Sequence, residues 1–218
     1  MPACDPIGPA PTIRRLPRYL ELLQIEQAAG RDVISTTTIA EMLSQTAIQV
    51  RKDLAITGVT GRPRVGYDIQ ELIAAIKGFL GWENVSDAFL VGAGHLGLAL
   101  LGYEGFAEHG LQIVAAFDVD RRKIGAQHHK HGIRDLATLP ALARRMHVHI
   151  AVLTVPRPVA QQTADMLVAA GIRAIWNFAD PRLQVPEHVV VETVQLSASL
   201  AMLSSRLQAS LNGKGLHP

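Results

Sequence analysis

Three glycines with a fixed spacing follow an apolar run near the middle of the chain. Phe89–Val91 leads into Gly92, Gly94 and Gly97, and helix-forming residues come directly after them. In a strand–turn–helix unit the first glycine permits a tight turn, the second lets a pyrophosphate approach the backbone, and the third lets the helix pack closely on the strand. The free N–H groups at the start of that helix favour an anion. The spacing therefore predicts a dinucleotide site, although a glycine-rich turn without a ligand has the same pattern.

An acidic residue stands where such a site needs one. Asp118 ends the next apolar run and lies 21 residues beyond Gly97, close to the spacing of roughly 20 residues at which an acid binds the ribose hydroxyls. This acid favours NAD over NADP. Arg121 and Arg122 follow directly, and basic residues at this place could instead bind a 2′-phosphate.

A second pattern lies in the first third of the chain. The segments Thr38–Ser44 and Thr46–Leu54 have helical apolar spacing, and each begins with a threonine that can cap a helix. Two short helices joined by a tight turn are typical of a helix-turn-helix motif. In the second helix we expect Ile48 and Leu54 to point inward. The outward side chains are then of types that contact base edges and phosphates, namely Gln49, Arg51 and Lys52.

A turn-rich segment follows the second helix. It combines Gly58, Gly61 and Gly66 with Arg62, Pro63 and Arg64, and it suits a β-ribbon wing with two arginines at its tip. From Arg51 to Gly66 there are four basic residues and one acidic residue, which makes a local basic patch. The pattern predicts DNA binding, and it also fits a helical cap that does not touch DNA.

Short β-branched runs alternate with helical segments after residue 86. The expected strands are Ala88–Val91, Gln112–Phe117, Val148–Val155, Ile172–Phe178 and Val189–Val194, with helices such as Leu139–Met146 and Val159–Ala170 between them. This alternation predicts βαβ units around a parallel sheet. The expected fold class is α/β, with an N-terminal winged helix-turn-helix and a Rossmann-type doubly wound parallel sheet.

The pattern divides the chain into four parts. We expect a flexible arm at residues 1–11, a winged-helix domain with a linker helix at 12–84, a Rossmann domain at 85–194, and a C-terminal helix and tail at 195–218. The linker helix begins at a predicted capping box from Asp68 to Glu71. The tail helix has a stripe of leucines that must be buried somewhere, so we expect it to dimerise. These are Leu196, Leu200, Leu203 and Leu207.

The composition excludes several classes of protein. With 218 residues, 48% of them hydrophobic and 18% charged, the chain can form a core and is neither disordered nor fibrous. Its 21 basic and 19 acidic residues give a net charge of +2, so any DNA contact needs a local patch. The single Cys4 excludes an internal disulfide and fits a reducing compartment. Because residues 89–103 are interrupted by glycines and no signal-peptide pattern opens the chain, we expect a cytoplasmic protein without a membrane partner.

The histidines do not form a metal motif. His128, His129 and His131 lie in one predicted loop without a common face, and His147 and His149 have no acid or cysteine paired with them. We expect no metal and no catalytic residue. A hydride-transfer enzyme would also need a substrate-binding lobe, whereas about two dozen residues follow the last expected strand.

A set of motifs runs through nearly the whole chain, namely Thr12–Leu20, Gln49–Leu54, Val65–Tyr67, Val91–Gly97, Tyr103–Phe106, Phe117–Asp120, Leu153–Pro156 and Asn177–Ala179. With these motifs and the order of its two modules, the chain resembles the Rex family of redox-sensing transcriptional repressors. The resemblance implies a homodimer whose C-terminal helix swaps onto the partner subunit, with NAD(H) as cofactor and palindromic operator DNA as partner. It also implies that DNA is released when NADH rises.

The resemblance further implies site residues. For the cofactor they are Gly92, Ala93, Gly94, His95, Leu96, Gly97, Asp118, Thr154, Val155 and Pro156, with Tyr103 and Phe106 bordering the nicotinamide. For DNA they are Thr46, Gln49, Arg51 and Lys52 at the major groove, and Arg62 and Arg64 near the minor groove.

This chain departs from the family at two charged positions. The family carries an arginine and an aspartate where this chain has Glu21 and Gln195, and in the family these charges exchange partners as the cofactor state changes. We therefore expect NADH to release DNA less completely. An alternative function is a nucleotide-binding sensor with an altered ligand response or without direct DNA binding. A small dehydrogenase or CoA-ligase-like fragment is a third.

Overall fold

The computed structural model describes residues 8–83, 85–179 and 182–211. The chain divides into two compact units, and the boundary lies between positions 84 and 85. Of the arm predicted at residues 1–11, residues 1–7 lie outside the described residues. The prediction is wrong for residues 10 and 11, which already belong to the first helix, Ala10–Ala28.

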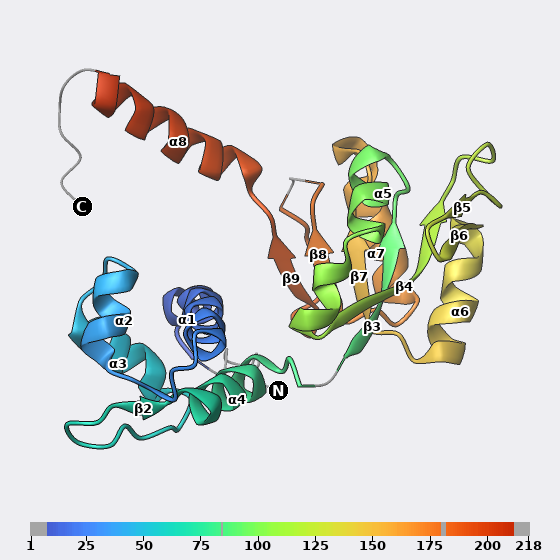
Figure 1. Ribbon diagram of the computed structural model, residues 1–218. Helices are drawn as coiled ribbons and strands as arrows, with labels where there is room; N and C mark the ends of the chain where they lie inside the picture. Colours follow the sequence, from blue (N-terminus) through green and yellow to red (C-terminus); the bar gives the residue numbers. More distant parts are fainter. Residues whose placement is uncertain (1–7, 84, 180–181, 212–218) are drawn as a thin grey trace. The chain divides into compact units, whose positions relative to one another are not determined.

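The first unit consists of helices and a short two-stranded sheet (Figure 1). Its elements are α1 (Ala10–Ala28), β1 (Val33–Ile34), α2 (Thr36–Met42), α3 (Ala47–Ala55), β2 (Tyr67–Asp68) and α4 (Ile69–Leu80). β1 pairs antiparallel with β2. The helices bury one apolar core, which includes Tyr19, Leu23, Ile39, Leu54, Leu72 and Ile76. This architecture is the predicted helix-turn-helix, α2 to α3, followed by a wing.

Capping residues fix where these helices begin. The Thr46 hydroxyl oxygen accepts the Gln49 N–H at 3.2 Å, and Asp68 Oδ1 accepts the Glu71 N–H at 2.9 Å, so both predicted caps are confirmed. The prediction of Thr38 as a cap is wrong, because Ser35 Oγ accepts the Thr38 N–H at 3.0 Å. Helix α2 thus begins almost one turn earlier than predicted.

The second unit is built on a seven-stranded sheet. Its elements are β3 (Ser86–Val91), α5 (His95–Leu101), η1 (Glu104–His109), β4 (Leu111–Asp118), β5 (Gln127–His128), β6 (His131–Asp135), η2 (Leu136–Thr138), α6 (Leu139–Met146), β7 (Ile150–Leu153), η3 (Arg157–Val159), α7 (Ala160–Ala169), β8 (Ala174–Asn177), β9 (Val190–Thr193) and α8 (Leu196–Leu211). The strand order is β5-β6-β4-β3-β7-β8-β9 (Figure 1). All neighbours are parallel except β5 and β6. The order reverses between β3 and β7, as in a doubly wound Rossmann sheet.

Successive side chains of β3 alternate between two separate hydrophobic cores, one on each face of the sheet. Phe89 and Val91 are buried with residues of α6 and α7, whereas Ala88 and Leu90 are buried with Leu101 of α5. Continuous apolar strands of this kind are typical of a parallel sheet covered on both faces. The structure therefore confirms the predicted α/β class.

The histidine-containing segments and the tail helix of the second unit differ in how well the sequence predicted them. The segment expected to be a histidine loop forms the β5–β6 hairpin, in which His128 pairs with His131 and His129 has a φ of +52°. His147, at the end of α6, has a φ of +54°. The tail helix is present as α8, and all four predicted leucines are exposed.

Candidate functional site

The glycine turn between β3 and α5 has a separate structural reason at each glycine. A Cβ atom on Gly92, whose φ is +101°, would lie 2.9 Å from the Thr154 carbonyl oxygen, and one on Gly97 would lie 2.1 Å from the Gly92 carbonyl oxygen. A Cβ on Gly94 would meet no atom within 4 Å. The first and third glycines are thus required by packing, while the second leaves the backbone open on the side where a pyrophosphate approaches.

Thr154 joins the turn to the neighbouring strand. Its backbone N–H donates to the Val91 carbonyl at 2.9 Å, and its hydroxyl donates to the Gly92 carbonyl at 2.7 Å. The ends of β3 and β7 are therefore held together at the point where the strand order reverses. In open α/β sheets this crevice is the ligand-binding position.

Asp118 is positioned at the end of β4 by donors from three directions. Its Oδ2 accepts the Ala93 N–H and the Lys123 ammonium, both at 2.9 Å, and its Oδ1 accepts the Asp120 N–H at 2.9 Å. Burial alone would raise the pKa of Asp118, but these hydrogen bonds and the Lys123 charge outweigh it and hold the pKa below 3.8. The carboxylate is therefore ionised at neutral pH and can accept a hydrogen bond from a sugar hydroxyl.

The basic residue beside Asp118 is not one of the two that the sequence suggested. Arg122 forms a two-point ion pair with Asp120 at 2.8 and 3.0 Å, and Lys123 is the cation that reaches Asp118. Lys123 directly follows Arg122, so the sequence alone could have suggested it as a further basic residue. That its side chain reaches Asp118 depends on the conformation of the turn after β4.

A cleft of about 810 Å³ lies over the carboxyl ends of these strands. Of the predicted cofactor residues, those that line it are Gly92, Gly94, His95, Leu96, Asp118, Thr154, Val155 and Pro156. Ala93 and Gly97 are buried in the turn beneath it. Several further residues that were not predicted to bind the cofactor also line the cleft, including Lys123, Leu136, Gln162, Thr163, Met166 and Phe178.

Tyr103 and Phe106 do not line this cleft. Their rings contact each other edge to face at 4.8 Å, and both line a separate cavity of about 530 Å³ together with His129 of the hairpin. Segment η1 follows the end of α5 that is farther from the glycine turn. That these two residues border the nicotinamide stays a prediction.

The outward face of α3 differs from the predicted one. Ile48 is 67% exposed, which contradicts its predicted inward position, whereas Val50 and Leu54 are fully buried. Val50 and Leu54 are four residues apart and therefore share one face of the helix, while Ile48 and Leu54 do not. Gln49 is also not free to point outward, since its amide donates to Asp53 Oδ1 at 2.9 Å. Arg51 and Lys52 are exposed as predicted.

Asp53 anchors α3 to α1 from inside the first unit. Its fully buried carboxylate accepts hydrogen bonds from the Thr12 hydroxyl at 2.9 Å, from the Arg15 guanidinium at 2.6 and 2.8 Å, and from the Tyr19 hydroxyl at 2.7 Å. Burial alone would raise the pKa of Asp53, but these donors outweigh it and lower the pKa to about 2. The helix that carries Arg51 is thereby held rigidly against its neighbour.

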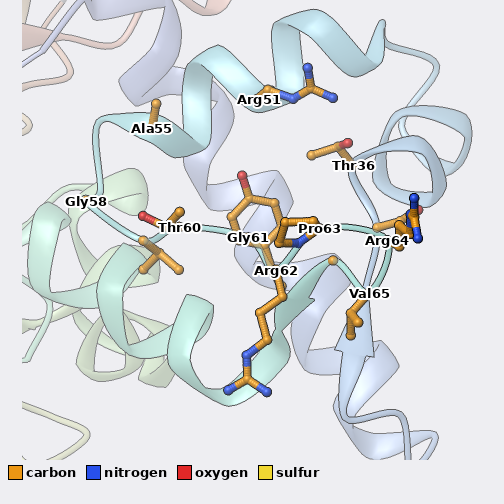
Figure 2. Close-up of a pocket in the computed structure, with 14 residues that line it drawn as sticks. Thr36, Arg51, Ala55, Gly58, Thr60, Gly61, Arg62, Pro63, Arg64 and Val65 are labelled. Atoms are coloured by element: carbon orange, nitrogen blue, oxygen red, sulfur yellow. The ribbon is translucent and has the colours of Figure 1, made fainter.

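The wing is a tight turn whose tip is arginine and proline. The Val65 N–H donates to the Arg62 carbonyl at 3.2 Å across Pro63 and Arg64, and Arg64 has a φ of +64°. Proline followed by a positive φ is a type II turn, in which the second central position normally belongs to glycine. The arginines do not converge. Figure 2 shows Arg51 and Arg64 bordering the hollow between α3 and the wing, while Arg62 extends away from Arg51.

Two further classes of site are absent from the described part of the chain. Among those residues, no group of three or more His, Cys, Asp or Glu side chains is placed to hold a metal ion. None of the helices in residues 8–83, 85–179 and 182–211 has both the length and the apolar character needed to cross a membrane.

Comparison with known proteins agrees with this two-part organisation. Residues 83–180 match the family described as "CoA binding domain", and residues 9–55 match "Putative DNA-binding protein N-terminus". The redox-sensing transcriptional repressor Rex of Treponema denticola is 49% identical over 89% of this chain and 92% of its own length, and that of Bacteroides fragilis is 42% identical over 91% and 90%.

Solved structures extend this similarity to the fold. A crystal structure of RSP in complex with beta-NAD+ and operator DNA has a TM-score of 0.88 at 35% identity and covers 95% of each chain. A structure of RSP in complex with beta-NADH has a TM-score of 0.87 at 35% identity and covers 97% of this chain and 99% of that one. The fold and site thus define a DNA-binding regulator with a Rossmann unit. The chain belongs to the Rex family of redox-sensing transcriptional repressors.

Proposed function

We propose that this protein is a redox-sensing transcriptional repressor that binds operator DNA through α3 and the wing and releases it when NADH binds in the cleft. The carrying observation is that one chain combines a cleft left open at Gly94 with an exposed helix face bearing Arg51 and Lys52. The relatives align over about 90% of both lengths, and RSP has been solved with beta-NAD+, beta-NADH and operator DNA. This similarity does not favour a sensor that lacks DNA contact, and it supports a regulator rather than an enzyme.

NAD(H) is the proposed ligand of the cleft because its chemistry fits the residues there. The open backbone at Gly94 would face the pyrophosphate, and Asp118 with Lys123 would bind the adenosine ribose. Thr154 and Pro156 would lie along the middle of the dinucleotide. When bound, NAD(H) supplies a redox signal, because its two forms differ in the charge of the nicotinamide ring. Tyr103 and Phe106 are not proposed for the cleft of their own chain.

A second copy of this chain is the proposed partner of α8. The helix exposes Leu196, Leu200, Leu203 and Leu207 to between 56% and 67%, and a stripe of this kind gains stability when it is covered. A two-fold dimer presents two copies of α3 to a palindromic operator. We further propose that the protein acts in the cytoplasm, where bacterial DNA is bound.

The experiment is a titration of operator binding against NADH and NAD+ at fixed salt. Fluorescence anisotropy of a labelled duplex from the protein's own upstream region measures DNA affinity in both cofactor states. The test variant is Gly94→Ala, because Gly94 lines the cleft and a Cβ at this position would meet no protein atom within 4 Å. The matched control is Gly78→Ala on α4, where a Cβ has an ordinary contact of 3.4 Å with Glu83.

We expect wild type and Gly78→Ala to bind the operator and to release it as NADH rises. Gly94→Ala should still bind the operator but should need a much higher concentration of NADH for release. Absence of operator binding by the wild type in either cofactor state would contradict the proposed DNA function. A normal NADH response in Gly94→Ala would show that the cofactor does not bind in this cleft.

A further inference from the structure

The outward face of α3 has an apolar residue at its leading end. Ile48, Arg51, Lys52 and Ala55 are all exposed, and their spacing of three, one and three residues places them on one face of the helix. Ile48 lies in the first turn, and its side chain is 67% exposed. The face is therefore a pair of cations with a branched aliphatic group beside them.

Among residues 8–83 of the first unit, no buried contact accounts for an isoleucine at this position. The buried core of α3 is supplied by Val50 and Leu54, and its N-terminus is capped by Thr46. A β-branched residue is also not among the best helix formers. A single exposed apolar side chain is common on protein surfaces, so its location decides the argument. Ile48 is on the face that the cations mark for DNA, near the helix end that contacts base edges in a helix-turn-helix protein.

The helix is held firmly enough for one methyl contact to matter. Asp53 connects α3 to Arg15 and Tyr19 of α1, and the Thr46 hydroxyl oxygen accepts the Gln49 N–H one residue beyond Ile48. These bonds fix both the rotation of α3 and its first turn. The backbone position from which Ile48 extends is therefore held in place.

The floor of the major groove offers one apolar partner to such a side chain. Guanine, adenine and cytosine present hydrogen-bonding groups there, whereas thymine adds a C5-methyl group. Ile48 has no donor or acceptor, so it cannot replace the water on a cytosine amino group, but it can bury a methyl. Resting on the proposed DNA function, we propose that Ile48 is a specificity-determining residue that contacts the C5-methyl of a thymine in each operator half-site.

The test removes that methyl from the DNA and the side chain from the protein. Deoxyuridine differs from thymidine only at the C5-methyl and pairs in the same way, so each thymine pair related by the palindrome is replaced in turn. For wild type, loss of the contacted methyl group in one half-site should weaken binding by about fourfold, which corresponds to ~0.8 kcal/mol for one buried carbon. Replacement of the contacted thymine pair removes this methyl group from both half-sites and should weaken binding roughly fifteenfold.

The protein variants are Ile48→Ala and, as a matched control, Ile25→Ala. Ile25 is also an exposed isoleucine on a helix of the same unit, and it is 58% exposed, compared with 67% for Ile48. Ile48→Ala should bind the thymine operator more weakly than wild type and should not distinguish thymine from uracil. Ile25→Ala should keep the full distinction. Because both side chains are exposed, the unfolding temperature of each variant should stay close to that of wild type.

Three results would overturn the inference. The first is a wild type that binds the operator but responds to no uracil replacement, and the second is an Ile48→Ala variant that keeps the response to uracil. In either case the proposed repressor function would stand. If the wild type did not bind the thymine operator at all, the proposed function and this inference would fail together.

Discussion

Replacing Asp53 with asparagine should destabilise the first unit. The carboxylate is fully buried and accepts five hydrogen bonds, two of which come from the Arg15 guanidinium. Asparagine has nearly the same shape but only one acceptor oxygen, and its NH₂ group would face donors instead of accepting from them. The variant therefore loses the ion pair without creating a cavity, so any effect reports the charge and its hydrogen bonds.

The size of the effect follows from the burial of both partners. Breaking a buried ion pair by removing one partner costs about 3–5 kcal/mol. The Arg15 side chain keeps 26% of its surface exposed, so water can partly replace the lost carboxylate and the low end, about 3 kcal/mol, applies. For a unit of this size each 1 kcal/mol shifts the midpoint by about 4–8 °C, so the transition of the first unit should fall by more than about 10 °C.

Thermal unfolding of the full chain, followed by circular dichroism at pH 7, measures this change. Asp120→Asn is the control, because Asp120 also has a pKa of about 2 but pairs with Arg122 at the surface. Exposed pairs contribute little to stability, so the control should unfold at the wild-type temperature. Equal shifts in the two variants, or a wild-type midpoint for Asp53→Asn, would refute the reasoning.

Acid should reveal the same carboxylate. The hydrogen bonds at Asp53 hold its pKa at about 2 against an ordinary value of 3.8, so its contribution is fully present above pH 4 and is lost as the pH falls from about 4 to about 2. The difference corresponds to roughly 2 kcal/mol. The midpoint of wild type should therefore fall more steeply across this window than that of Asp53→Asn.

Three further changes address the wing, the tail helix and the switch. Arg64→Gly relieves the positive φ of +64° and should stabilise the first unit by up to about 1 kcal/mol, while it weakens operator binding because a cation is lost; loss of stability would show that the turn is not type II in solution. A chain truncated at Ser197 lacks α8 and should be a monomer by light scattering, and a truncated chain that remains a dimer would contradict the role of the leucine stripe. Glu21→Arg combined with Gln195→Asp restores the charges expected in the family and should make operator release by NADH more complete, whereas an unchanged release curve would show that other contacts carry the switch.

Local backbone patterns were predictable from the sequence. The glycine spacing and Asp118 depend on residues within one βα unit and its following strand, and the structure has the open backbone at Gly94 where the pattern requires it. The caps at Thr46 and Asp68 are equally local. The misplaced cap of α2 has a simple cause, since Ser35 begins a run of four hydroxyl residues, each of which could cap a helix.

Contacts between distant segments were not predictable. Asp53 receives four of its five hydrogen bonds from α1, some 34 to 41 residues earlier, and no spacing rule connects these residues. The error at Ile48 was avoidable, because Val50 and Leu54 have the separation of four residues that defines the inward face. The β5–β6 hairpin was missed because its paired strands are short and rich in histidine, so no alternation of apolar residues could develop.

Because a second copy of the chain is the proposed partner of the exposed leucines of α8, the state of this protein would depend on its own abundance. When a helix is covered by a second copy, the free energy of covering it enters through mass action, and the midpoint of unfolding rises with protein concentration. Occupancy of a palindromic operator then requires two chains for each bound unit. While most chains are single, halving their number lowers the amount of the paired form by more than half. Repression would therefore respond to changes in the supply of this chain more steeply than in proportion, whatever the level of NADH.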